Sequence, residues 1–101
     1  MKMVFVIYRQ SLDQEIRRLL KGIDVKAFTE APKLFGMGDA SDAPHASFGQ
    51  GHNCMILSAM KETQARRVIE QLKDFRDELA TLRGTDKVPL RVFAFPCEEM
   101  V

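Results

Sequence analysis

The feature that most constrains this fold is the order of its hydrophobic segments, which read strand, helix, strand and then strand, helix, strand. Residues 2–8 (KMVFVIY) form an apolar run of strand length, too continuous for a strand with one face in water. Residues 53–61 (NCMILSAMK) form a second apolar run of strand length, and residues 25–35 and 88–97 predict two further strands. Pro32 cannot donate to a sheet ladder, so it predicts an edge, a bulge or the point where its strand leaves the sheet.

Two segments have the periodicity of amphipathic helices. In LDQEIRRLLKG, leucine and isoleucine recur at i, i+4, i+7 and i+8. Ser11 and Gln14 form a capping-box pattern at its start, and Gly22 is a natural C-cap. The second helix, over residues 63–82, is longer and ends at Gly84. Its apolar stripe comprises Ala65, Val68, Ile69, Leu72, Phe75, Leu79 and Leu82.

The resulting order, βαββαβ, predicts an α+β fold of the ferredoxin-like type, a four-stranded antiparallel sheet with both helices on one face. We expect a single domain over residues 1–101. The other sheet face is also apolar, and monomers seldom keep such a patch exposed, so we expect it to be buried between subunits. Its members are Met3, Phe5, Ile7, Met55, Leu57, Ala59, Phe93 and Phe95.

Between the second and third strands lies a glycine-rich loop at about 36–51, whose sequence from Met37 is MGDASDAPHASFGQG. A stretch of about 14 residues without regular structure is uncommon in a small domain unless it is functional or disordered. We therefore expect this loop to be functional or disordered. Its candidate functional residues are Met37, Asp39, Asp42, His45 and Phe48.

Composition excludes several classes of protein. The formal net charge is +1, whereas a nucleic-acid-binding surface needs a clear basic excess. No apolar run reaches the roughly 18 residues of a membrane span, and the N-terminus lacks the pattern of a signal peptide. Cys54 and Cys97 are isolated, as expected of reduced thiols. We expect a cytoplasmic protein that is not membrane-embedded and has no nucleic-acid partner.

The segment LLKGIDVKAFTEAPKLFGMGDAS resembles the PII signal-transduction family. In that family a V-K-x-(apolar)-T strand follows the first helix, and a glycine-bearing segment then opens a long T-loop. The element order over most of the chain is also similar to the family's. The matching residues here are Val25, Lys26, Phe28, Thr29, Gly36 and Gly38.

The resemblance implies a function. PII proteins are trimers that bind adenine nucleotides in the clefts between subunits, and their T-loop grips or releases a transporter, enzyme or regulator. By this resemblance, Thr29 would lie beside the base, and the backbone from Gly36 to Gly38 would approach the phosphates. The chain would then be a divergent PII-like sensor and a homotrimer, with a membrane transporter or its regulator as partner.

The turn after the second helix is the other place where the resemblance bears on a ligand. The family has a phosphate loop ending G-x-G-K there, and this chain has Arg83-Gly84-Thr85-Asp86-Lys87. Gly84 and Lys87 match the outer members of that motif, and Asp86 replaces the inner glycine. From the residues alone, Arg83, Gly84 and Lys87 are either an anion site or a helix C-cap with basic residues that complement the helix dipole.

A metal site is the alternative hypothesis. His45, His52 and Cys54 offer imidazole and thiolate groups, which suit Cu(I) or Zn(II). His52 and Cys54 share a face in an extended strand, but two ligands are too few for a structural zinc. A site shared between subunits, in a trimer similar in architecture to the CutA family, would complete the set. The simpler explanation is a loop histidine and a core cysteine.

No catalytic pattern is present in the sequence. It contains no Ser-His-Asp or Cys-His signature, no HExxH and no P-loop, so it favours a binding protein over an enzyme. A dimeric αβ-barrel monooxygenase shares this element order, but it would need a polar-lined pocket between sheet and helices, which no residue pattern indicates. A third hypothesis is a structural or small-molecule-binding oligomer in which the loop has no role.

Overall fold

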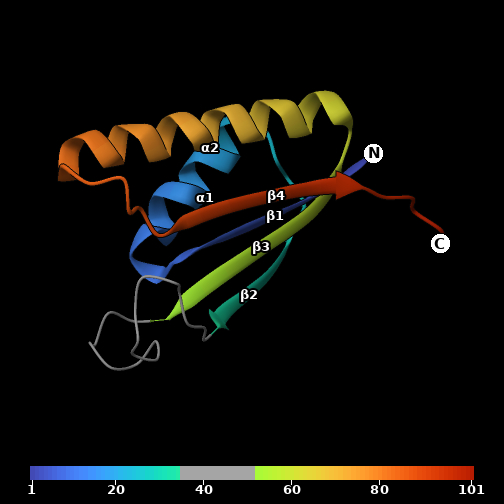
Figure 1. Cartoon of the computed structure of the whole chain (residues 1–101). Helices are drawn as coiled ribbons and strands as arrows, with labels where there is room; N and C mark the ends of the chain where they lie inside the picture. Colours follow the sequence, from blue (N-terminus) through green and yellow to red (C-terminus); the bar gives the residue numbers. More distant parts are fainter. Residues whose placement is uncertain (35–51) are drawn as a thin grey trace.

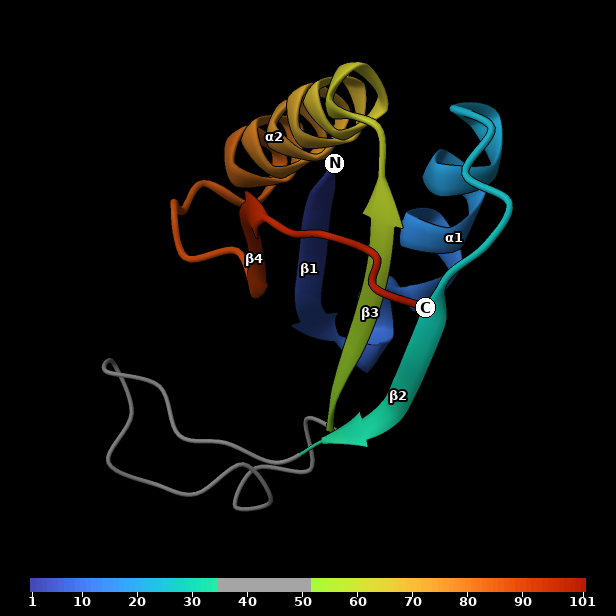
Figure 2. The ribbon, with the colours of Figure 1, turned by 90° about the vertical axis from the view of Figure 1, so that its right-hand side faces the viewer.

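The computed structural model describes residues 1–34 and 52–101, and its four strands form one antiparallel sheet in the order β2-β3-β1-β4. Both helices lie on the same face of this sheet (Figures 1 and 2). The predicted ferredoxin-like α+β plait is therefore confirmed. In chain order the elements are β1 (Lys2–Arg9), the 3-10 turn η1 (Gln10–Leu12), α1 (Asp13–Gly22), β2 (Thr29–Leu34), β3 (Asn53–Met60), α2 (Glu62–Arg83) and β4 (Leu90–Pro96).

The core lies between the sheet and the two helices, because alternate side chains of the central strands point toward the helices. Along β1 every second residue from Val4 to Tyr8 is buried, and Cys54 and Ile56 continue this layer in β3. Each large apolar side chain buried in this way stabilises the fold by roughly 1.5–3 kcal/mol. The helices contribute Ile16 and Leu20 from α1 and Ala65, Val68 and Leu72 from α2.

The opposite face of the sheet is apolar and no described helix covers it (Figure 2). Phe93 and Phe95 are 49% and 46% exposed, and the rings of Phe5 and Phe95 lie 5.4 Å apart between centroids. The predicted second apolar face is thus confirmed, and its burial between subunits stays a prediction. We call it the open face; Arg91, the partner of Ile7 in the register, shares it, and its apolar members are Met3, Phe5, Ile7, Met55, Leu57, Ala59, Phe93 and Phe95.

Both predictions for the ends of α1 are wrong. The chain passes from β1 directly into η1, so Ser11 already lies inside a helical turn and forms no cap; the N-cap is Leu12, without a side-chain hydrogen bond. Gly22 is the last residue of the helix, and the left-handed residue after it is Asp24, at φ 68°. Aspartate is among the few residues besides glycine that adopt this conformation readily.

The second strand begins later than the sequence pattern indicates. β2 starts at Thr29, whereas Val25 belongs to the connection after α1, where its N–H donates to the carbonyl of Leu20 at 3.0 Å. Val25 is buried, so its apolar character reflects packing against the core and not a place in the sheet. Pro32 is predicted to mark an edge, a bulge or the point where its strand leaves the sheet; β2 is an edge strand, and its register with β3 shifts between Ala31 and Leu34.

In α2, the apolar residues of the predicted stripe are buried or half-buried, except the last one. Leu82 is 82% exposed, because the final turn of α2 projects beyond the sheet (Figure 1). β4 begins at Leu90, two residues later than the predicted start at Val88. Within the described ranges, neither helix is long and apolar enough to cross a membrane.

Candidate ligand-binding site

Thr29 lies at the rim of the open face. It is the first residue of the edge strand β2, and its side chain is exposed. In the register of the sheet Thr29 pairs with Leu57, Leu57 with Phe5, and Phe5 with Phe93. Because residues directly opposite one another share a face, Thr29 ends an apolar row that crosses the whole sheet. A ligand that contacts Thr29 would lie at the edge of this apolar surface.

The turn after α2 presents two cations on a well-defined backbone. Gly84 adopts φ 65°, and the N–H of Thr85 donates to the carbonyl of Ala80 at 3.1 Å, which is the helix C-cap expected of glycine. The N–H of Lys87 donates to the Thr85 hydroxyl at 3.1 Å, so this amide is used within the turn. The side chains of Arg83 and Lys87 are exposed and can meet an external anion.

One chain does not bring these two groups together. β2 and β4 are opposite edges of the sheet, separated by β3 and β1, and three strand spacings amount to about 14 Å. Figure 2 shows β2 and β4 on the two sides of the sheet, with the turn that follows α2 beyond β4. Within one chain, Thr29 and the 83–87 turn therefore lie at opposite edges of the sheet.

A polar network that the sequence analysis did not identify ties β2 to α1 and β1. Asp13 accepts a hydrogen bond from the Tyr8 hydroxyl at 2.6 Å and another from Nε of Arg17 at 2.9 Å. Arg17 also donates to Glu30 of β2, and its guanidinium lies 5.8 Å from the centre of the Phe28 ring. We call this set the Asp13 network. It anchors the strand that leads into residues 35–51.

The pKa values within the Asp13 network follow from burial and hydrogen bonding. Burial raises the pKa of Tyr8 far above its ordinary value, and the hydrogen bond to Asp13 raises it further. Burial acts to raise the pKa of Asp13 as well, but the hydrogen bonds from Tyr8 and Arg17 outweigh it and hold that pKa below its ordinary value. Asp13 is therefore an ionised acceptor, and both of its hydrogen bonds are strengthened by its charge.

The sequence contains one signal that could have identified part of this network, the spacing of Asp13 and Arg17. Asp13 and Arg17 are four residues apart on one helix, the spacing at which opposite charges meet. Tyr8 and Glu30 join the pair only through packing of separate elements, which no local pattern encodes.

The described residues do not assemble a metal site. Cys54 is buried, and its thiol donates to the carbonyl of Pro32 at 3.3 Å. Burial raises the pKa of this thiol and the charge of Asp13 raises it further, which disfavours the thiolate that metals bind. Over residues 1–34 and 52–101, no three histidine, cysteine, aspartate or glutamate side chains lie close enough to hold a metal ion. His52 lies just before β3, and His45 is outside the described residues.

The remaining predicted residues also lie outside the described part of the chain. These are the two glycines expected near phosphates, Gly36 and Gly38, and the partner-contacting residues Met37, Asp39, Asp42, His45 and Phe48.

Comparison with known proteins gave matches among solved structures only: no family model matches, and no curated protein matches. The chain is similar to CPII, a nitrogen regulatory PII-like protein from Thiomonas intermedia K12, in its structure bound to ADP, AMP and bicarbonate. The TM-score is 0.67 at 20% identity, over 93% of this chain and 86% of CPII. The apo form of CPII gives a TM-score of 0.65 at 19% identity, over 93% and 85% of the two chains.

A Thermus thermophilus protein assigned to the PII-like signalling class is also similar, with a TM-score of 0.65 at 16% identity over 93% of this chain and 82% of that one. At these low identities, the TM-scores establish a shared fold and no more. The resemblance to PII-like proteins predicted from the sequence is therefore confirmed at the level of the fold.

Proposed function

We propose that this chain is a PII-like sensor that binds an adenine nucleotide in a cleft between the subunits of a homotrimer. The observation that carries this proposal is the separation of Thr29 from the 83–87 turn, with the apolar open face between them. We infer that the assembly that buries the open face brings Thr29 of one chain near the turn of another. The nucleotide-bound structures of CPII support the class of ligand.

The charges of the turn suggest which nucleotide fits. Lys87 and Arg83 would face the phosphates, since they are exposed cations beside the helix cap at Gly84. The carboxylate of Asp86 stands in the same turn and repels a phosphate chain unless a cation intervenes. We therefore expect ADP or AMP to bind more tightly than ATP. The backbone of Gly36 and Gly38 would complete the phosphate contacts.

The 36–51 segment would carry the signal to a partner, which we expect to be a membrane transporter or its regulator. It follows β2 directly, and the Asp13 network holds that strand against α1 and β1. A ligand can regulate this segment only if it binds one of its conformations more tightly than the others. The protein would be a single cytoplasmic domain that senses a ligand and catalyses no reaction.

A thermal-shift panel with ATP, ADP, AMP, cyclic AMP and bicarbonate tests the proposal. A ligand present at about 100 times its Kd stabilises a protein by about 2.7 kcal/mol, which raises the Tm of a small domain by roughly 10–20 °C. We expect ADP or AMP to give a shift that Lys87→Ala abolishes. Lys61→Ala is the matched control, because Lys61 is an exposed lysine at the opposite end of α2.

Two outcomes would contradict the proposal. One is the absence of any nucleotide shift in a protein that is also monomeric by sedimentation. The other is a nucleotide shift that survives Lys87→Ala unchanged. A shift with Cu(I) or Zn(II) alone would favour the metal alternative based on His45, His52 and Cys54.

A further inference from the structure

A pocket of about 340 Å³ lies between α2 and β4, on the helix-covered side of the sheet. Its volume is at the lower end of the roughly 300–1,000 Å³ typical of small-molecule sites. The α2 side chains recur at i, i+3, i+4 and i+7, so they share one helix face. The lining residues are Ile69, Leu72, Lys73 and Arg76 from α2 and Leu90 and Val92 from β4.

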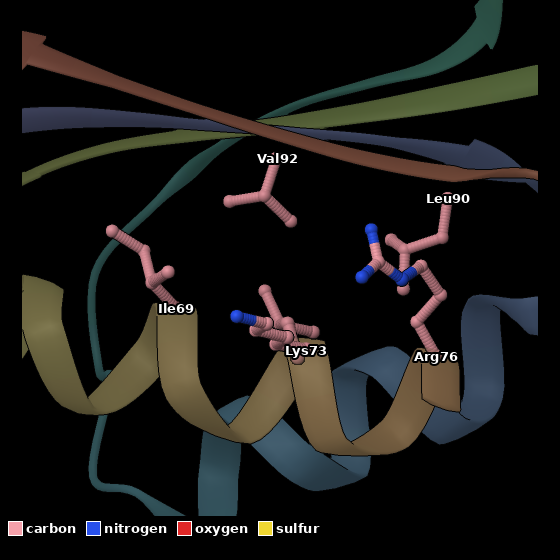
Figure 3. Close-up of a pocket in the computed structure, with 6 residues that line it drawn as sticks. Ile69, Lys73, Arg76, Leu90 and Val92 are labelled. Atoms are coloured by element: carbon pink, nitrogen blue, oxygen red, sulfur yellow. The ribbon is translucent and has the colours of Figure 1, made fainter. Parts of the chain in front are cut away.

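The pocket combines an apolar floor with a basic rim. Leu72 and Leu90 are buried, and Ile69 and Val92 are half-buried beside them. Figure 3 shows the side chains of Lys73 and Arg76 rising from α2 into the space beneath β4. Among the residues that the structure describes, both polar lining residues are cations and no acidic residue lines the pocket.

The two rim cations are only weakly neutralised. Among the described residues, no carboxylate lies within ion-pair distance of Lys73. Arg76 has a 3.4 Å contact with its neighbour Asp77, and both of these side chains are about half exposed. An exposed ion pair of this kind contributes little to stability, so Arg76 can leave Asp77 and pair with a better-placed anion.

We propose that this pocket binds a small amphiphilic carboxylate. Its apolar chain would lie on Leu72, Leu90 and Val92, and its carboxylate would lie between Lys73 and Arg76. The two cations of the rim favour a negatively charged ligand, and the apolar floor favours a ligand with an apolar chain. The site is separate from the proposed nucleotide site, because Lys73 and Arg83 are ten residues apart on α2, about 15 Å along the helix axis.

A purely structural explanation exists for the same residues. Lysine and arginine often lay their methylene stems over apolar surface while the charged ends stay in water. In that case the charges would have no ligand, and an anion would gain nothing from them. The two explanations therefore differ in whether binding depends on the charge of both ligand and protein.

The experiment uses octanoate as the probe and octan-1-ol as its uncharged counterpart. Two-dimensional amide NMR of the full chain monitors the binding of each. We expect octanoate to shift the signals of residues 69–76 and 90–92. Lys73→Gln combined with Arg76→Gln should weaken octanoate binding about tenfold, while the weaker binding of octan-1-ol stays unchanged. Arg66→Gln combined with Arg67→Gln is the matched control, since these exposed arginines lie on α2 outside the pocket lining.

Several results would overturn the proposal. These are equal octanoate affinity in the wild type and the Lys73/Arg76 variant, shifts located elsewhere, such as on the open face, or no shift at millimolar octanoate. Because both substituted side chains are exposed, we expect the variant to fold, and its circular dichroism spectrum checks this. The octanoate response should persist in Lys87→Ala, which separates this site from the nucleotide site.

Discussion

At the scale of single residues, Tyr8 gives the most direct physical test of the fold. It is the only tyrosine in the chain, it is buried, and its hydroxyl donates to Asp13. Burial and this hydrogen bond raise the pKa of Tyr8 above its ordinary value of 10.0. A raised pKa in the folded state stabilises the fold below that ordinary value, and this stabilisation is lost as the pH rises above it through the folded pKa.

We therefore expect the folded protein to show no tyrosinate absorbance near pH 10.0, so that the signal appears only as the chain unfolds at higher pH. Tyr8→Phe should cost about 1 kcal/mol at neutral pH through the lost hydrogen bond. Above pH 10.0 the wild type should lose stability faster than Tyr8→Phe, as urea unfolding would measure. Lysine titration is common to both proteins and cancels in this difference. Tyrosinate absorbance in the folded protein with a midpoint near 10.0 would refute the burial of this hydroxyl.

At the scale of elements, the two glycines at the helix ends should respond to alanine with opposite signs. Gly84 has φ 65° in the cap of α2. Gly22 is helical, and beyond its chain neighbours and its own helix backbone no atom of the described residues lies within 4 Å of a Cβ added there. Gly84→Ala should destabilise the fold by about 1–2 kcal/mol, because alanine is strained in the left-handed region. Gly22→Ala should stabilise it by about 0.5–1 kcal/mol. Urea unfolding of the two variants checks both signs, and equal effects would contradict the difference between these helix ends.

The same elements show how far the sequence could predict the structure. Hydrophobic periods placed every strand and helix, because burial selects alternate residues in strands and one stripe in helices. Capping patterns failed at Ser11 and Gly22, and the strand pattern failed at Val25, because the path of the chain between elements decides the local conformation there. The resemblance to PII motifs selected Thr29, Gly84 and Lys87, because each of them lies within a short continuous motif of the sequence.

The Asp13 network and the pocket were beyond sequence reasoning for a different reason. The network needs Tyr8 from β1 and Glu30 from β2 beside a helical pair, and the pocket needs β4 across from Lys73 and Arg76. Each set comes from segments far apart in the sequence. Such contacts depend on the final packing, which no local period specifies.

At the scale of the whole molecule, two features point to a second chain. They are the open face and the separation of Thr29 from the 83–87 turn. The core on the helix side is complete within one chain, with Ile16, Val68 and Leu72 fully buried. The open face leaves Phe93 and Phe95 about half exposed, although they lie on the strand β4 and not on a loop. Assembly through this face is therefore coupled, in our proposal, to formation of the nucleotide site.

Phe93→Glu tests that coupling. A glutamate placed among Phe5, Leu57 and Phe95 would lose most of its hydration if a second chain covered the open face, and an unpaired buried charge costs several kcal/mol. The folded monomer should tolerate the change, because Phe93 is 49% exposed within one chain. We expect sedimentation velocity to show a monomer and the ADP-induced Tm shift to disappear together.

Leu82→Gln is the control, since Leu82 is a large apolar residue that is 82% exposed at the end of α2, and glutamine adds no negative charge beside Arg83. It should leave both the assembly and the ADP response intact, because this helix end lies away from the open face. If Phe93→Glu remained oligomeric, the open face would not be the interface. If it became monomeric and still bound ADP, the nucleotide site would belong to one chain, and the separation of Thr29 from the 83–87 turn would have to be explained without a second subunit.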